Sequence, residues 1–470
     1  MRIENRTKEG ISMESGNGKE FDELGDSTVE ARADGMPNWN DRALTDEMIE
    51  DDRQRPGVDV PFLVLTMLLL AIGVIMVLSA SFAREYYTTG NPTRLFMRQF
   101  VFAVSGVALM LITSRVSPRV LSRWSMPLLL VTMGLLVLVL VAGVKLNGAR
   151  RWLSIGGQNS VLTFQPSEIA KLALVLASAQ MVCAFGRARM RTFKFGVLPF
   201  VALTAVLVGL IVIEPHLSAV IIITLLAAVM MFAGGTRLRW FLIAGLAVAA
   251  VAGLLIFSFV ILPGRDKAAD PGGERRGVKM IMMETEWDKL GLGYAGRRIN
   301  AWLHPDADPL GDGFQISQSL YAVGSGGLLG QGLGQSRQKY LYLPEEHNDY
   351  IFAIVCEELG YIGAILILML FTLLIVRGFM LATRARDKFS SLVVTGITSL
   401  LAIQVFLNVA VVTNLLPATG ISLPFFSSGG TALWIQLVQV GIVLSISRNI
   451  PAQAEKRKLK EIDDTKTAAQ

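Results

Sequence analysis

Several stretches of about 20 residues hold no charged side chain, for example 124–143 and 217–234, and each can cross a bilayer as an α-helix. Lipid offers no partner for free backbone N–H and C=O groups, so apolar runs of this length must be helical. Of the 470 residues, 52% are hydrophobic and 17% are charged. The sequence therefore predicts an all-α polytopic membrane protein with about ten transmembrane helices. The expected spans are 60–82, 99–115, 124–143, 163–185, 195–213, 217–234, 239–262, 350–376, 390–416 and 428–448.

Lys and Arg are concentrated in alternate connections between these spans. The basic connections are 115–123, 186–194, 236–239 and 377–388. By contrast, 214–216 and 417–427 contain neither residue. Because basic connections remain in the cytoplasm, we expect both termini inside. The one large loop, 263–349, is then extracytoplasmic, between helices 7 and 8. Within this loop we expect a short amphipathic helix at 297–305, ended by a proline, and a second helical segment at 315–323.

Two tails flank the membrane domain predicted at 56–450. Residues 1–55 hold 15 acidic and eight basic side chains without apolar periodicity, which indicates a disordered acidic cytoplasmic tail. Residues 451–470 form a basic cytoplasmic tail. The chain as a whole carries +6, so the part after the acidic tail is strongly basic. This excess suits membrane topology and anionic lipids, and we expect no nucleic-acid partner.

Cysteine and histidine are sparse. Cys183 and Cys356 both lie in expected spans, which indicates neither a disulfide framework nor a metal cluster. The three histidines are scattered along the chain, so the sequence predicts no metal site.

Charge gathers at the membrane boundary in residues 343–358. Asp349 directly precedes an apolar span, where Asp is either an N-cap or a functional carboxylate. Glu345 and His347 are expected on a solvated rim, as is Glu346. Glu358, with its neighbour Glu357, lies two turns deeper, where an unpaired carboxylate is costly, so at least one should face a partner or a water-filled cavity.

Three further patterns have structural alternatives. Glu168 and Lys171 are three residues apart on one helix face and can neutralise each other. The glycine-rich stretch 324–334 lacks the Gly-Lys-Ser/Thr ending of a phosphate loop, so tight backbone packing is the better interpretation. Irregular backbone at 417–430 is tolerated near a membrane only where protein or a cavity surrounds it, and it is either a cavity lining or a structural re-entrant turn.

Several motifs carry a family resemblance that covers roughly residues 60–450. They include Phe164-Gln-Pro-Ser-Glu-Ile-Ala-Lys171, Gly332-Leu-Gly-Gln-Ser-Arg-Gln-Lys339 and Gly420-Ile-Ser-Leu-Pro-Phe-Phe-Ser-Ser-Gly-Gly430, together with the stretches around Arg298, Gln318 and Trp152. These closely resemble the SEDS family (shape, elongation, division and sporulation), and the division and sporulation members more than the elongation members.

The resemblance implies a peptidoglycan glycosyltransferase that polymerises lipid II, an undecaprenyl-pyrophosphate-linked disaccharide peptide, outside the cytoplasmic membrane of a bacterium. It implies Asp349 as the catalytic base of an inverting transfer. It also implies a class B penicillin-binding protein and other division proteins as partners. Departure of pyrophosphate makes Mg²⁺ or Mn²⁺ an expected charge screen, although no acidic cluster identifies a site.

The same resemblance suggests the remaining site residues. Guanidinium forks suit a pyrophosphate, which favours the two arginines near the fourth span. The implied substrate-binding residues are Arg150, Arg151, Glu168, Lys171, Lys145, Arg298, Gln318, Ser325, Lys339, His347 and Ser427. The implied structural residues are Glu345, Glu358, Pro424 and Gly429.

One motif departs from the family pattern. Where relatives usually carry Pro-Asp followed by Gly-Thr, this chain has Pro215-His216-Leu-Ser218-Ala219, and a role for that position is in doubt. Two other functions stay open, namely a lipid II transporter, for which intramembrane charge and a polar cavity are also expected, and a non-catalytic division scaffold.

Overall fold

The computed structural model describes residues 57–146, 149–154, 163–214, 216–246, 293–303, 305 and 311–450. In these ranges nine helical segments are long and apolar enough to span a membrane, which confirms the polytopic helical architecture. The helices are α2 (Val60–Thr89), α3 (Arg94–Thr113), α4 (Pro118–Ala142), α5 (Pro166–Met190), α6 (Phe193–Gly196) running into α7 (Leu198–Ile213), α8 (Leu217–Gly234), α14 (Ile351–Arg384), α15 (Lys388–Val412) and α16 (Gly430–Ser447).

The expected seventh span, 239–262, is described only in part, as a helix over 238–246. Its remainder, the tails 1–55 and 451–470, and the first part of the large loop lie outside the described residues. The count of ten helices, the disorder of the acidic tail and the cytoplasmic position of both tails therefore stay predictions. The two helical segments expected in the large loop are confirmed as α12 (Gly293–Leu303) and α13 (Asp312–Ser325).

A small antiparallel sheet between α4 and α5 departs from the all-α prediction. It consists of β1 (Val144–Leu146), β2 (Ala149–Ser154) and β3 (Thr163–Phe164), in that spatial order. Lys145 pairs with Arg150 across the first two strands, and Leu153 pairs with Phe164 across the next two. The pairing occupies backbone groups that would otherwise emerge unsatisfied where the helices end.

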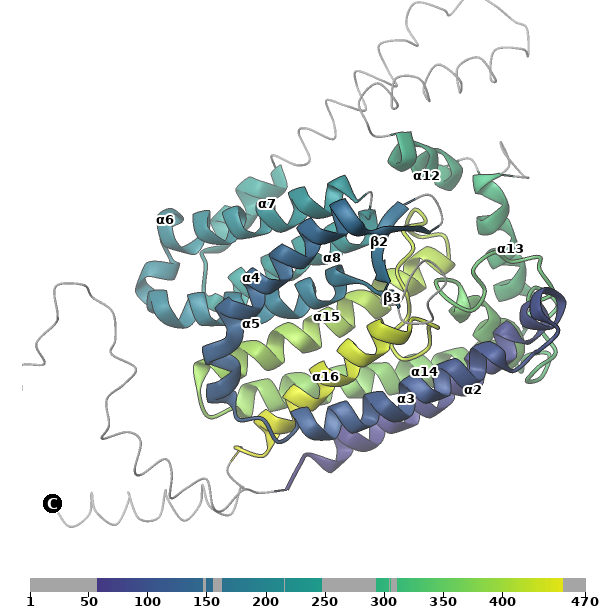
Figure 1. Cartoon of the computed structure of the whole chain (residues 1–470), viewed down its shortest axis with the longest axis horizontal. Helices are drawn as coiled ribbons and strands as arrows, with labels where there is room; N and C mark the ends of the chain where they lie inside the picture. Colours follow the sequence, from purple (N-terminus) through teal and green to yellow (C-terminus); the bar gives the residue numbers. More distant parts are fainter. Residues whose placement is uncertain are drawn as a thin grey trace, which may run out of the picture. The chain divides into compact units, whose positions relative to one another are not determined.

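The core of the helical domain lies along α5, α15 and α16, whose membrane windows are the most buried. Around it α3 packs on α16, α4 on α5, and α2 on α14 (Figure 1). One end of the bundle is fixed by Asp59, which we call the Asp59 end. The Asp59 carboxylate caps α2 by accepting from Phe62 N at 3.0 Å, and it binds Arg377 of α14 at 2.6 Å.

The opposite end carries the sheet, α12, α13 and the loop after α15 (Figure 1). We call it the Asp349 end, because Asp349 precedes α14 there. The loop after α15 covers residues 413–429, and α12 and α13 hold its start and the end of α15. Trp302 Nε1 of α12 donates to Asn414 O at 2.9 Å, and Ser319 Oγ of α13 donates to Val412 O at 2.9 Å.

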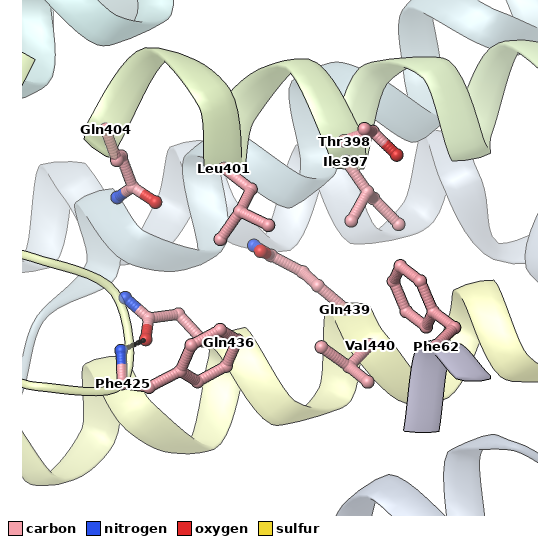
Figure 2. Close-up of a pocket in the computed structure, with 9 residues that line it drawn as sticks. All are labelled: Phe62, Ile397, Thr398, Leu401, Gln404, Phe425, Gln436, Gln439 and Val440. Carbon is pink, nitrogen blue, oxygen red and sulfur yellow. Dashed lines mark hydrogen bonds between the residues drawn. The ribbon is translucent and has the colours of Figure 1, made fainter. Parts of the chain in front are cut away.

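One glutamine of α16, Gln436, anchors the same loop from inside the bundle. A cavity of about 20 Å³ lies between α15, α16 and α2. Figure 2 shows that Gln404, Gln436 and Gln439 are among the residues that line it. That volume holds about one water molecule. Gln436 Oε1 accepts from Phe425 N at 3.0 Å, and Phe425 has a φ of 66°. A polar side chain of the core thus accepts the hydrogen bond of a loop N–H group that lies outside any helix.

Candidate active site

Asp349 lies two residues before α14 and faces the loop 413–429. A Cβ built on Gly420 would lie 3.1 Å from Asp349 Oδ2 and 3.7 Å from Ser218 Oγ. Gly420 also has a φ of 72°, a conformation that favours glycine. The backbone of this loop can therefore approach the carboxylate closely, without a side chain between them.

The main chain around Asp349 is held firmly. Asn408 Nδ2, on α15, donates to both Asp349 O and Ile421 O at 2.7 Å. On the other side, Ser427 Oγ donates to Asn348 O at 2.9 Å, and Ser428 N donates to His347 O at 3.2 Å. A positioned base needs this kind of support, because the reacting atoms must stay in register.

The Asp349 carboxylate is not used as a helix cap. The cap residue of α14 is Tyr350, and no side chain caps this helix. Asn408 Nδ2 donates to the backbone oxygen of Asp349, not to its carboxylate. The N-cap alternative is therefore wrong, since no side chain among the described residues caps α14.

Burial and neighbouring charges act on the pKa of Asp349 in opposite directions, and the net effect raises it. Burial, followed by the Glu345 carboxylate, raises the pKa of Asp349 to about 6, against the opposing effects of Arg298, His347 and Arg151. A carboxyl group with a pKa near the working pH can both accept and release a proton efficiently. Groups on separate elements thus set the pKa of Asp349.

Two arginines reach this site from separate elements. Arg298, on α12, donates from Nη1 to Gln315 Oε1 at 3.2 Å. Arg151, on β2, donates from Nε to Glu214 O at 3.4 Å. The sheet, which the sequence did not predict, therefore brings Arg151 near enough to lower the pKa of Asp349.

The expected rim is partly interior. Glu346 is only 1% exposed, and it lies 3.5 Å from Arg84 and 3.6 Å from His347. The prediction of a solvated Glu346 is therefore wrong. Arg84 and His347 offset the cost of burying its carboxylate. Glu345 accepts from Asn348 Nδ2 at 2.7 Å and has a φ of 55°, so it shapes the turn before Asp349.

Beneath the sheet, His216 fills the position that departs from the family pattern. Its ring lies 3.4 Å from Gln165 Nε2 and 3.3 Å from Ser167 Oγ. Burial, then the charges of Arg151 and Lys171, lowers the pKa of His216 to about 3. The imidazole is therefore neutral at pH 7. Its two side-chain neighbours, Gln165 and Ser167, are also uncharged.

Two carboxyl groups, those of Glu214 and Glu168, belong to the elements that also carry the neighbours of His216. Burial raises the pKa of Glu214 to about 8, against the effect of Arg151, and both Glu214 oxygens lack a hydrogen-bond partner among the described residues. Glu168 Oε2 lies 2.7 Å from Lys171 Nζ, which confirms the predicted pair. Since the Glu168–Lys171 pair is internally neutral, its predicted contact with substrate stays a prediction.

A second polar cluster joins α2, α14 and residues 336–339. Lys339 Nζ lies 2.9 Å from Glu358 Oε1, and both side chains are buried. Ser79 Oγ donates to Glu358 at 2.7 Å, and Glu357 accepts from Ser336 Oγ at 2.5 Å and Arg337 N at 2.9 Å. The prediction that the deep carboxylates face partners is confirmed. The ammonium group of Lys339 is thus held in a buried ion pair, and its predicted contact with substrate stays a prediction.

The glycine-rich stretch packs on a break in α14. Gly360 has a φ of 68° inside this helix, and a Cβ built there would lie 2.2 Å from Gly330 N. Backbone bonds cross the contact, from Gly332 N to Glu358 O at 3.0 Å and from Tyr361 N to Gly327 O at 2.9 Å. The packing interpretation of this stretch is confirmed.

A family model described as "Cell cycle protein", which covers the FtsW, RodA and SpoVE proteins, matches residues 60–451. This chain belongs to the FtsW/RodA/SpoVE family. That assignment confirms the SEDS resemblance and, with it, the polytopic helical fold.

Named relatives span most of this family member. Stage V sporulation protein E of Bacillus subtilis is 39% identical over 397 residues, which are 84% of this chain and 98% of the relative. A probable peptidoglycan glycosyltransferase FtsW of Trichlorobacter lovleyi is 36% identical over 394 residues, or 83% of this chain and 93% of the relative. Division and sporulation proteins are thus both similar to it.

Two solved structures share the fold. One belongs to a peptidoglycan synthase complex that coordinates polymerization and crosslinking, with 29% identity, a TM-score of 0.61, and coverage of 83% of this chain and 98% of that one. The other is the rod shape determining protein RodA of Thermus thermophilus, with 26% identity, a TM-score of 0.56, and coverage of 84% and 98%.

The remaining predicted site residues of this FtsW/RodA/SpoVE chain lie on several different elements. Arg150 is exposed on β2, beside Lys145 of β1. Gln318 is half-buried on α13, while the exposed Ser325 ends that helix with Oγ bonded to Ala322 O. Pro424 is buried in the loop 413–429, and Gly429 caps α16. No contact links Ser325 to Asp349 within the described ranges.

The sequence interpretation missed two residues of this family member. Asn408, which fixes the Asp349 backbone, lies in an apolar span, where a buried amide is costly without a role. Glu214 directly follows another apolar span, α7, where a buried carboxyl group is costly for the same reason. Neither belongs to a metal site, because among the described residues no three His, Cys, Asp or Glu side chains could hold an ion together. The expected Mg²⁺ or Mn²⁺ has no fitting donor set there.

Proposed function

We propose that this chain polymerises lipid II into glycan strands, with Asp349 as the general base. Relatives that cover most of its length are named probable peptidoglycan glycosyltransferases, and the chain is an enzyme of that class. The observation that carries the proposal for Asp349 is its carboxylate, which lies against the open backbone of Gly420 and has a pKa raised to about 6 by burial and by Glu345.

The reaction needs one base and a screened leaving group. The 4-hydroxyl oxygen of the acceptor GlcNAc attacks C1 of MurNAc while its proton passes to the Asp349 carboxylate. The bond from C1 to the lipid pyrophosphate breaks, the electron pair leaves with the pyrophosphate, and the configuration at C1 inverts. Proton removal by a positioned side chain contributes about 10²–10⁴-fold to such a rate.

The arginines around Asp349 suit the negative charge of the leaving group. Arg151 and Arg298 both act electrostatically on Asp349, so they lie in the same region as the base. Planar guanidinium groups bind phosphate oxygens through two parallel hydrogen bonds. We assign them to the pyrophosphate, with Arg150 and His347 as further contacts. A requirement for Mg²⁺ or Mn²⁺ remains part of the proposal, without protein ligands assigned to it.

The orientation and the partner complete the proposal. Basic connections are expected in the cytoplasm, which puts the Asp349 end of the bundle outside the cytoplasmic membrane, where lipid-linked disaccharides are joined. A solved neighbour comes from a peptidoglycan synthase complex. A class B penicillin-binding protein fits that role here, because new glycan strands must also be crosslinked.

The test uses the full-length protein in vesicles that contain lipid II, with and without a cognate transpeptidase. Glycan polymer and lipid II translocation are measured on the same sample. Polymer formation by the wild type supports the proposal. Translocation without polymer under both conditions would contradict it and favour a lipid transporter.

A further inference from the structure

An apolar groove lies between α4 and α5, in the half of the bundle near the Asp59 end. Its volume is about 230 Å³, more than the roughly 150 Å³ of an engineered apolar cavity that binds benzene. Six side chains of α4 and one of α5 line it: Val120, Leu121, Trp124, Pro127, Leu128, Val131 and Leu176. None of these residues belongs to the Asp349 site, which is near the other end of α4.

The groove has the length of one leaflet. Val120 and Val131 are 11 residues apart in α4, which is about 16 Å along a helix. Half of a hydrocarbon core is about 15 Å. Trp124 is 62% exposed in the first turns of α4, at the depth where interfacial tryptophans lie. A single extended acyl chain therefore matches the groove from the interface to the middle of the membrane.

Positive charge surrounds the shallow end of the groove. Arg115, Arg119 and Arg123 are all exposed, and in the described ranges none of them takes part in an ion pair. Arg119, Arg123 and Pro127 are four residues apart and form one row of α4, which leads directly into the groove. Helical side chains slant towards the helix N-terminus, so both guanidinium groups reach towards the headgroup level.

We propose that this groove binds one acyl chain of an anionic phospholipid of the cytoplasmic leaflet, with Arg119 and Arg123 on its phosphate. The choice of leaflet rests on the orientation given in the proposed function, whereas the binding chemistry does not. Each basic side chain near a membrane surface favours anionic lipid by roughly five-fold, so removing both arginines should abolish a preference of at least that size.

Quenching of Trp124 fluorescence by lipids with brominated acyl chains tests this proposal. The full-length protein is reconstituted with anionic lipid in both leaflets, so that its orientation has no effect. Its Trp124 signal is obtained as the difference between the wild type and Trp124→Phe. Brominated phosphatidylglycerol is titrated against brominated phosphatidylcholine. The expected result is half-maximal quenching at a roughly five-fold or more lower fraction of phosphatidylglycerol.

The double variant Arg119→Gln/Arg123→Gln should lose this preference. The matched double variant Arg237→Gln/Arg384→Gln, which removes the same charge from exposed positions on other basic connections, should keep it. Equal quenching of the wild type by both lipids would overturn the proposal, as would quenching by neither lipid, which would indicate that protein covers the groove. Because the readout needs no polymerisation, failure here is distinct from failure of the proposed function.

Discussion

The buried Lys339–Glu358 pair gives a stability prediction whose size follows from the structure. Lys339→Met removes the ammonium 2.9 Å from Glu358 and leaves a carboxylate that is 1% exposed with Ser79 and the Ser336 amide as its partners. Breaking a buried pair from one side costs about 3–5 kcal/mol. At about 2 °C per kcal/mol for a large domain, we expect a thermal midpoint lower by about 6–10 °C.

The double variant Lys339→Met/Glu358→Gln should recover part of this loss, because it leaves no unpaired charge. Thermal unfolding in detergent, followed by intrinsic fluorescence, measures both. Lys388→Met, the same change at an exposed position, is the matched control and should shift the midpoint by about 1 °C or less. An unchanged midpoint for Lys339→Met would refute the buried pair, and a double variant as unstable as the single one would refute the coupling.

Three further predictions concern pH and backbone. Polymerisation rates should rise with pH through about 6, because Asp349 must lose its proton to act, and Glu345→Gln should move this limb to lower pH; initial rates between pH 4.5 and 8 test both. Glu214→Gln should raise the thermal midpoint at pH 7 but not at pH 4. The raised pKa of Glu214 keeps the folded carboxyl protonated while the unfolded one ionises, a loss of at most about 3 kcal/mol at pH 7. Gly360→Ala should lower the midpoint by several degrees, since its Cβ would lie 2.2 Å from Gly330 N, whereas Gly134→Ala meets open space and should not.

Hydropathy could predict the spans because a bilayer fixes both the length and the apolar character of a helix. The span 217–234 matches α8 at both ends. The sheet could not be predicted in the same way, since β1–β3 are short strands of mixed polarity whose pairing depends on where α4 and α5 end. Lys339 illustrates another limit, because Ser79 of its cluster is 260 residues away along the chain, and local patterns do not specify such partners.

The sequence predicted the central residue of the candidate site but not most of the contacts around it. Charge at a membrane boundary indicated Asp349, and the family resemblance favoured catalysis over capping. The backbone partner of Asn408 and the burial of Glu214 emerged only from the fold, although a polar side chain in or beside an apolar span already indicates a role. The rim prediction for Glu346 is wrong because Arg84 of α2, which is 262 residues away along the chain, accompanies it into the interior.

Glycan synthesis by purified Asp349→Asn tests the central claim most directly. The variant keeps the size of the side chain and removes the base, so the rate of polymerisation from lipid II should fall by about 10²–10⁴-fold. Its thermal midpoint at pH 7 should be no lower than that of the wild type, because burial disfavours the ionised carboxylate. Glu346→Gln provides a nearby carboxylate control, whose polymerisation should persist. Polymer made by folded Asp349→Asn at the rate of the wild type would contradict the assignment of Asp349 as the base.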